Sequence, residues 1–388
     1  MQYGRGVAKT VPPPPELQAL RREIDQLDRQ LLQLLRQRMD VVRQVATVKQ
    51  STSRAIRDFA REREILDDRR ARAEALDMNP APIESIYRQI MLASRDYQAA
   101  LGASAPRQVD QKRVAIIGGH GEMGGLLARL FAELGHRVTL SDLDTELTPK
   151  VAAAAAEVVV ISVPIETTLQ VIAEVGPALS PEALLMDITS IKQAPLAAML
   201  AATEASVIGT HPMFGPGVHS LQGQRVVVCA GRGKRWHRWL VDLLEGRGLV
   251  VTEADAAEHD RAMALVQVLT HFQTQVLGRT LEQLNRPIEA SRPFTSPAYL
   301  MELYVAARHF AQDPRLYGPI EMLNPETAAV TAAFSRAAEE LREILERRDQ
   351  GRFDAIFEEV RAYFGDFTAE ALEQSSFLID RLVERGLG

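Results

Sequence analysis

The sequence predicts a multidomain chain with an all-α domain, then an α/β domain built on a doubly wound parallel sheet, then a second all-α domain. Apolar residues recur at steps of three and four between residues 17 and 48, which indicates a long helix. Strand-like runs alternate with helical runs from 113 to 253, and only helical runs follow up to 388. A chain of 388 residues is long enough to bury a core in each part.

Composition narrows the class of protein. Charged residues make up 25% and the net charge is −6, so nothing indicates a basic surface for nucleic acid. The only cysteine, Cys229, excludes a disulfide within the chain and a cysteine-rich zinc site, and it fits a reducing compartment. The most apolar stretch, Val151–Ile165, is too short to cross a bilayer. We therefore expect a cytoplasmic protein with small-molecule ligands and without a metal, nucleic-acid or membrane partner.

The first helical domain is expected over residues 16–101, after a proline-bearing disordered tail, 1–15. Its first helix runs without Pro or Gly from Leu17 to Ser51, and roughly 30 residues of helix span about 45–50 Å. So long a helix cannot bury its apolar stripe inside a small domain, so we expect it to pack along a second copy of the chain. Turns near 51–55 and 79–82 separate it from helices at about 58–76 and 82–100, and a polar linker follows, 102–112.

The α/β domain is expected over 113–253, and the second helical domain over 254–388. Strands are predicted at 113–118, 138–142, 158–163, 184–188, 207–209 and 226–229. Between the first strand and a helix at 126–134 lies the motif Gly119-x-Gly121-x-x-Gly124. In this context it predicts a Rossmann-type dinucleotide site: Gly119 permits the tight turn, Gly121 lets the backbone approach a pyrophosphate, and Gly124 allows close packing of helix on strand.

The next strand ends at Asp142, 23 residues after Gly119. Its carboxylate suits the ribose hydroxyls and repels a 2′-phosphate, and no Lys or Arg follows before Lys150, so NAD is favoured over NADP. Ligands in such sheets lie beyond the carboxyl ends of the strands, where we expect the nicotinamide side. The cofactor-binding set is Gly119, Gly121, Met123, Gly124, Asp142, Val163 and Pro164.

Cations on the first helix predict an anion site. Arg38 and Lys49 share a helical face about 16 Å apart, whereas Arg21 lies roughly 25 Å from Arg38. One molecule cannot bring Arg21 beside Arg38 on a small ligand, but a dimer with antiparallel long helices can. Taken singly, each of these residues is more often a solvated charge.

The whole pattern is similar to the all-helical chorismate mutase family, with Arg21, Arg38, Lys49, Asp58-x-x-Arg61-Glu62 and the late pair Ser94 and Gln98. The resemblance implies that Arg38, Arg61, Ser94 and the partner subunit's Arg21 hold two carboxylates. It further implies that Lys49 and Gln98 hydrogen-bond the ether oxygen of chorismate, and that Glu62, with Asp58 nearby, receives the ring hydroxyl. The rearrangement to prephenate needs no nucleophile, only a folded dianion and stabilised charge on the ether oxygen, which Arg and Lys can supply.

Later motifs lie beyond strand ends and in the helical part. They are Ser190-x-Lys192, the segment 209–216 with His211 in a rigid loop, Glu258-His259-Asp260, Leu269-Thr-His271-Phe272 and 308–317. Together they resemble the prephenate dehydrogenase family. The resemblance implies that His211 draws the proton from the C4 hydroxyl while hydride leaves for the nicotinamide, and that Ser190 orients His211. It also implies that Arg308 binds a carboxylate, with Lys192 and His271 near the substrate.

Because a catalytic histidine must be neutral to accept a proton, activity is expected to fall at low pH as His211 is protonated. His259 has two interpretations, a functional residue or part of a charge cluster at a helix start, and His120 is interpreted as incidental.

The order of the parts resembles the bifunctional enzymes of tyrosine biosynthesis, which convert chorismate to prephenate and then, with NAD, to 4-hydroxyphenylpyruvate, CO₂ and NADH. The resemblance further implies a homodimer and possible inhibition by tyrosine. One alternative is another NAD-dependent dehydrogenase, for example of 3-hydroxy acids, whose first helices only dimerise; the complete mutase set argues against it. A non-catalytic sensor would need a damaged site, and the motifs are intact. Arogenate is a narrower alternative substrate.

Overall fold

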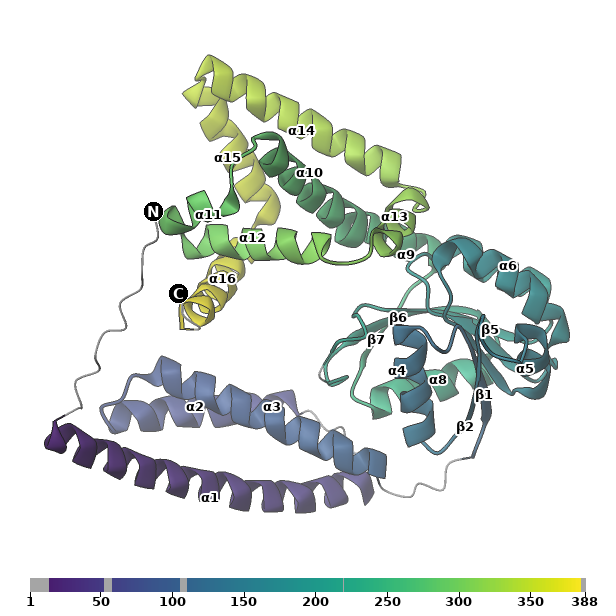
Figure 1. Ribbon diagram of the computed structural model, residues 1–388, viewed down its shortest axis with the longest axis horizontal. Helices are drawn as coiled ribbons and strands as arrows, with labels where there is room; N and C mark the ends of the chain where they lie inside the picture. The colour runs from purple at the N-terminus through teal and green to yellow at the C-terminus, as the bar shows by residue number, and fades with distance from the viewer. Residues whose placement is uncertain (1–13, 52–57, 105–109, 219, 385–388) are drawn as a thin grey trace, which may run out of the picture.

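The computed structural model describes residues 14–51, 58–104, 110–218 and 220–384. Figure 1 shows the three parts, which follow one another along the chain in the predicted order: a helical part, the part with the sheet, and a second helical part. Most of the expected tail 1–15, most of the turn 51–55 and part of the linker 102–112 lie outside the described residues. Among the helices of the described ranges, none combines the length and apolarity that a bilayer crossing needs.

The N-terminal domain consists of α1 (Pro15–Ser51), α2 (Phe59–Ala75) and α3 (Pro80–Ser104). Pro80 was expected to lie in a break between helices, but it is the first residue of α3. Proline is tolerated there because the N–H groups of the first helical turn have no hydrogen-bond partner within the helix. Asp58 caps α2 by accepting a hydrogen bond from the backbone N–H of Arg61 at 3.0 Å. The apolar stripe of α1 stays exposed in the single chain, over Leu17, Leu20, Ile24, Leu27, Leu31, Leu34, Leu35, Val41, Val45 and Val48.

The central sheet has seven strands in the order β2-β1-β3-β4-β5-β6-β7. The strands are β1 (Arg113–Ile117), β2 (Arg137–Ser141), β3 (Val158–Ile161), β4 (Leu184–Asp187), β5 (Ser206–Pro212), β6 (Arg225–Arg232) and β7 (Val250–Glu253). Neighbours pair in parallel except β5 and β6. The predicted α/β sheet is confirmed, but the sequence reasoning missed β7 and the antiparallel pair.

One consequence concerns His211, which was predicted to lie in a loop. It lies inside β5, because the antiparallel pairing with β6 sets His211 opposite Val227 and extends the strand to Pro212. A strand prediction from β5 alone ends at Gly209, since the partner strand supplies the hydrogen bonds beyond it.

Helices cover both faces of the sheet (Figure 1). One face packs against α4 (Glu122–Glu133) and α8 (Lys234–Gly246), through Phe131 and Leu240. The other packs against α5 (Pro149–Ala155), α6 (Ile165–Val175), the short turn η1 (Gly176–Ala178) and α7 (Gln193–Ala202), through Ile172 and Met199. The sheet is therefore buried on both sides, as its continuous apolar strands require.

Every regular element of the C-terminal part, within the described residues, is a helix or a helical turn. Its elements are α9 (Ala256–Met263), the π-helical turn η2 (Ala264–Leu269), α10 (Thr270–Gln283), α11 (Ile288–Ser291), η3 (Arg292–Phe294), α12 (Pro297–Phe310), α13 (Pro314–Met322), α14 (Thr327–Arg347), α15 (Gln350–Phe364) and α16 (Phe367–Glu384). The first of them, α9, buries His259, Asp260 and Met263. It packs against α7 and β6 of the sheet domain, so the two parts meet there.

Candidate active sites

The glycine loop between β1 and α4 is too tight for side chains. Gly118 has φ +82°, and a Cβ there would lie 2.3 Å from the Ser162 carbonyl oxygen. The left-handed turn is thus at Gly118, one residue before the glycine predicted for it. A Cβ on Gly119 would lie 2.8 Å from Leu140 Cδ2, and one on Gly124 would lie 2.2 Å from the Gly118 carbonyl oxygen. Close packing at Gly124 is as predicted.

The loop fits a pyrophosphate. Gly121 is the N-cap of α4 and makes no side-chain cap, so the first N–H groups of the helix face outward without a competing oxygen. Asp142 lies against the loop: its Oδ2 accepts the backbone N–H of His120 at 2.8 Å, and its Oδ1 accepts that of Leu143 at 2.8 Å. Met123 is half-buried in the first turn of α4.

The residues that follow β3 also border the candidate cofactor site. A Cβ on Gly118 would lie 3.0 Å from Val163 Cγ1, and Pro164 is the N-cap of α6. The structure therefore brings the predicted cofactor-binding residues together at the carboxyl ends of β1, β2 and β3, where this class of sheet binds dinucleotides.

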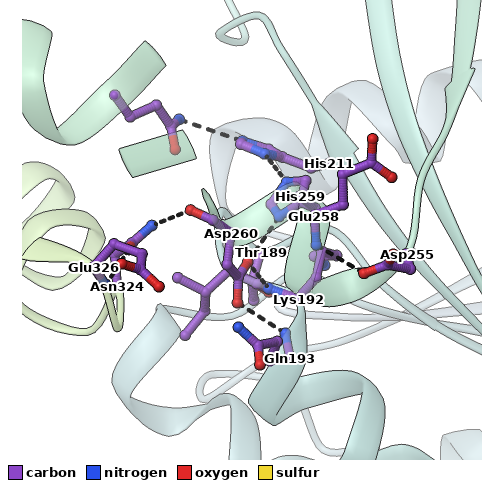
Figure 2. A network of polar contacts seen from close by, with 12 residues as sticks. Thr189, Lys192, Gln193, His211, Asp255, Glu258, His259, Asp260, Asn324 and Glu326 are labelled. Atoms are coloured by element: carbon purple, nitrogen blue, oxygen red, sulfur yellow. Dashed lines mark hydrogen bonds and ion pairs between the residues drawn. The ribbon is translucent and has the colours of Figure 1, made fainter. Parts of the chain in front are cut away.

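His211 is 3% exposed and begins a chain of hydrogen bonds, drawn in Figure 2. Its Nδ1 lies 2.9 Å from His259 Nε2, and His259 Nδ1 lies 2.8 Å from Asp260 Oδ1. Its other nitrogen, Nε2, lies 3.4 Å from the Gln267 amide on η2. Burial is the main cause that lowers the pKa of His211 well below its usual value, and the nearby His259 and Lys192 contribute less. The imidazole is therefore neutral near pH 7 and can act as a hydrogen-bond acceptor.

His259 was given two interpretations from the sequence, and the structure makes it the partner of His211. The only sequence signal was its position beside Asp260, since His211 and His259 are 48 residues apart. Within the described part of the chain, no hydrogen bond joins Ser190 to His211. The orienting contact that was predicted for Ser190 is thus made by His259.

Lys192 does not line a substrate site, contrary to the prediction. It is 0% exposed; its Nζ forms an ion pair with Asp187 and donates to the Thr210 carbonyl oxygen at 2.8 Å. Burial lowers the pKa of Lys192, while the charge of Asp187 opposes this. The lysine therefore contacts the backbone of β5, the strand that carries His211, from a position without solvent exposure.

His271 and Arg308 come from the helical part. The ring of His271 lies 4.8 Å from that of Tyr317 and 5.4 Å from that of His309. Burial, and then His309, lower the pKa of His271 to about 4. Arg308 is exposed in the last turn of α12.

In the N-terminal domain, Arg38 hydrogen-bonds Ser94, and the Gln98 amide donates to the Ser94 carbonyl oxygen at 3.3 Å. Burial is the main cause that lowers the pKa of Arg38. Lys49 is half-buried on the same helix as Arg38, and Arg21 is exposed near the far end. Arg38, Ser94 and Gln98 thus meet where α1 packs against α3.

Two residues of α2 lie differently from the prediction. Arg61 is exposed and pairs with Glu64 at 2.7 Å, so the single chain does not bring it beside Arg38. Glu62 forms an ion pair with Arg95 of α3, at a position that the sequence reasoning did not select. No motif marks Arg95, so only the packing of α2 on α3 identifies it.

Comparisons with known proteins cover all three parts. The family model described as chorismate mutase type II matches residues 20–99. The models of the prephenate dehydrogenase nucleotide-binding domain and dimerization domain match 132–253 and 255–359. The solved prephenate dehydrogenase of A. aeolicus, in complex with hydroxyphenyl propionate and NAD+, has the same fold over 66% of this chain and 98% of that one, with a TM-score of 0.55 and 20% identity.

Curated relatives match almost the full length. The T-protein of Haemophilus influenzae is 36% identical over 369 residues, which are 94% of this chain and 97% of that protein. The T-protein of Enterobacter agglomerans is also 36% identical, over the same shares of both chains. The chain therefore belongs to the T-protein family, the bifunctional chorismate mutases and prephenate dehydrogenases of tyrosine biosynthesis.

Proposed function

We propose that this chain rearranges chorismate to prephenate on its N-terminal helices and then oxidatively decarboxylates prephenate with NAD in the other two parts. The observation that carries the second step is His211, a buried neutral imidazole whose Nδ1 is engaged by His259. Its Nε2 is left to accept a proton from a substrate hydroxyl.

In the dehydrogenase step, His211 Nε2 accepts the proton of the C4 hydroxyl of prephenate. The N-terminus of α4 would hold the pyrophosphate of NAD and Asp142 its ribose, and the bound cofactor would supply the hydride acceptor for C4. From the helical part, Arg308 binds a substrate carboxylate, and His271 lies near the substrate. Loss of CO₂ makes the ring aromatic, which drives the reaction forward.

In the mutase step, the side chains only hold and polarise the substrate. Arg38, Arg61 and the partner subunit's Arg21 hold the two carboxylates, with help from Ser94. Lys49 and Gln98 stabilise charge on the ether oxygen, and Glu62 with Asp58 receives the ring hydroxyl. The role of Arg61 requires it to leave Glu64 when the dianion binds.

A homodimer supports this arrangement. The exposed stripe of α1 includes Leu27 at 53% and Leu31 at 57% exposure, more apolar surface than a stable monomer leaves open on one helix. The match to a dimerization domain over 255–359 supports a second contact between subunits. A cytoplasmic location and inhibition by tyrosine remain part of the proposal; adding tyrosine to the NADH assay tests the second.

The first experiment supplies purified protein with chorismate and NAD and follows NADH. NADH formation supports both activities on one chain, because chorismate must first become prephenate. The substitution His211→Asn is expected to abolish NADH formation from prephenate while NAD binding and chorismate consumption persist. Wild-type kcat in that variant contradicts the role of His211.

A further inference from the structure

His211, His259 and Asp260 form a series of two hydrogen bonds, which we call the His211 path (Figure 2). His259 and Asp260 are each 1% exposed, and they belong to α9, whereas His211 belongs to β5. The distances along the path are 2.9 Å and 2.8 Å, both within normal hydrogen-bond length.

Asp260 is held as a carboxylate. It accepts the backbone N–H of Lys192 at 2.7 Å and of Gln193 at 3.0 Å, at the start of α7. Although burial raises the pKa of Asp260, the hydrogen bonds from His259 and from these two N–H groups outweigh it and keep that pKa below its usual value. The Asn324 side chain donates to the Asp260 carbonyl oxygen at 2.9 Å, which anchors the same residue to the segment between α13 and α14.

When both histidines are neutral, the carboxylate of Asp260 sets the donor and acceptor roles along this series of hydrogen bonds. A carboxylate only accepts, so His259 carries its proton on Nδ1. With its single proton on Nδ1, His259 accepts at Nε2, and His211 then presents its proton on Nδ1. The remaining nitrogen of His211, Nε2, then carries no proton. It lies 3.4 Å from the Gln267 amide of η2, on the side where the substrate hydroxyl is proposed to lie.

Resting on the proposed function, we propose that His259 and Asp260 are positioning residues of the dehydrogenase, which fix the proton of His211 on Nδ1 and stabilise the imidazolium formed during turnover. The hydroxyl proton moves to His211 Nε2, and the O–H electron pair forms a carbonyl as hydride leaves C4. When the bond to CO₂ breaks, its electron pair enters the ring, and the resulting phenolate takes the same proton back. His211 thus holds a charge only between the two events.

A buried imidazolium is costly without a partner. Here its Nδ1–H faces His259 Nε2, and the next proton faces the carboxylate of Asp260, so the charge is shared along the path. The contact also explains why burial at this position does not prevent His211 from acting as a base.

The test uses the full chain with prephenate and NAD, and three variants. His259→Leu removes the acceptor, His259→Gln keeps an amide oxygen that can accept from Nδ1, and His237→Leu is the control. His237 lies on α8 of the sheet domain, 3.7 Å from Glu253. Tryptophan fluorescence checks the fold, because both tryptophans, Trp236 and Trp239, lie on α8.

For His259→Leu we expect kcat to fall on the order of 10²-fold, the usual contribution of a positioned acid–base group, while KM for prephenate and the Kd of NAD change by less than about threefold. His259→Gln should recover about tenfold of the lost kcat, and the control should match wild type. His259→Leu with wild-type kcat overturns the proposal. So does a Gln variant no better than Leu, or a loss of NAD affinity in step with kcat. Wild-type protein without NADH formation would instead defeat the proposed function itself.

Discussion

The buried ion pair of Lys192 and Asp187 allows a test of whether Lys192 stabilises the fold or contacts the substrate. Both side chains are 0% exposed, and the lysine also donates to the Thr210 carbonyl oxygen. Methionine keeps the length of the lysine stem but removes its charge. The variant Lys192→Met therefore leaves Asp187 charged, buried and without its cation.

Removing one partner of a buried ion pair costs about 3–5 kcal/mol, because the remaining charge is uncompensated. That is a large part of the roughly 5–15 kcal/mol that stabilises a whole domain. For a domain of about 150–250 residues it corresponds to a fall in Tm of about 6–20 °C. The double variant Lys192→Met with Asp187→Asn should recover part of this loss, because no charge is left buried.

The assay is thermal unfolding followed by tryptophan fluorescence, which reports the sheet domain because both tryptophans lie on α8. Lys150→Met, at an exposed lysine of the same domain, is the control and should unfold like wild type. At a temperature where the variant is folded, KM for prephenate should be unchanged. An unchanged Tm together with a large rise in KM would refute the reasoning and return Lys192 to the substrate site.

Three further predictions follow from the sites. Gly124→Ala places a Cβ 2.2 Å from a backbone oxygen, so NAD affinity measured by titration should fall at least about tenfold while mutase activity is kept; unchanged affinity would contradict the loop assignment. In the proposed mechanism neutral His211 is the active form, and burial holds its pKa well below 6.5. We therefore expect kcat/KM for prephenate to stay level as the pH falls through 6.5 and to decline only at lower pH. An inflection at pH 6.5 in the pH profile would count against the assignment. Leu31→Glu, in the middle of the α1 stripe, should shift the protein toward monomer in light scattering and lower mutase activity about tenfold or more, since the partner subunit's Arg21 is lost; a fully active monomer would disprove the shared site.

The sequence was sufficient where a function depends on local pattern. The glycine spacing, the strand before it and Asp142 all lie within one unit of strand, turn and helix, so their geometry followed from the spacing. The helical periodicity of α1 likewise predicted both its length and its uncovered stripe. Only the exact turn residue, Gly118, was one position off.

The sequence was insufficient where a side chain depends on what packs on it from far away. In the sequence, Lys192 and His211 are both polar residues near the ends of predicted strands. In the structure, Lys192 is buried in an ion pair with Asp187, whereas His211 hydrogen-bonds His259 of α9. Whether a residue pairs with a neighbour 48 positions away depends on the register of β5 with β6 and on the docking of α9. Neither leaves a periodic signal in the chain.

The residues of the His211 path come from two domains, which limits how genes of this family can recombine and still encode an active dehydrogenase. The mutase side chains all lie within the segment matched from 20 to 99, so a genetic exchange could gain or lose that activity as one block. The proposed base of the dehydrogenase, His211, lies before residue 253, and its two hydrogen-bonded partners lie after residue 255. A crossover between distant relatives at that boundary would join a base to a foreign helix. Such chimaeras should retain dehydrogenase activity only when both parents carry the same pairing at β5 and α9.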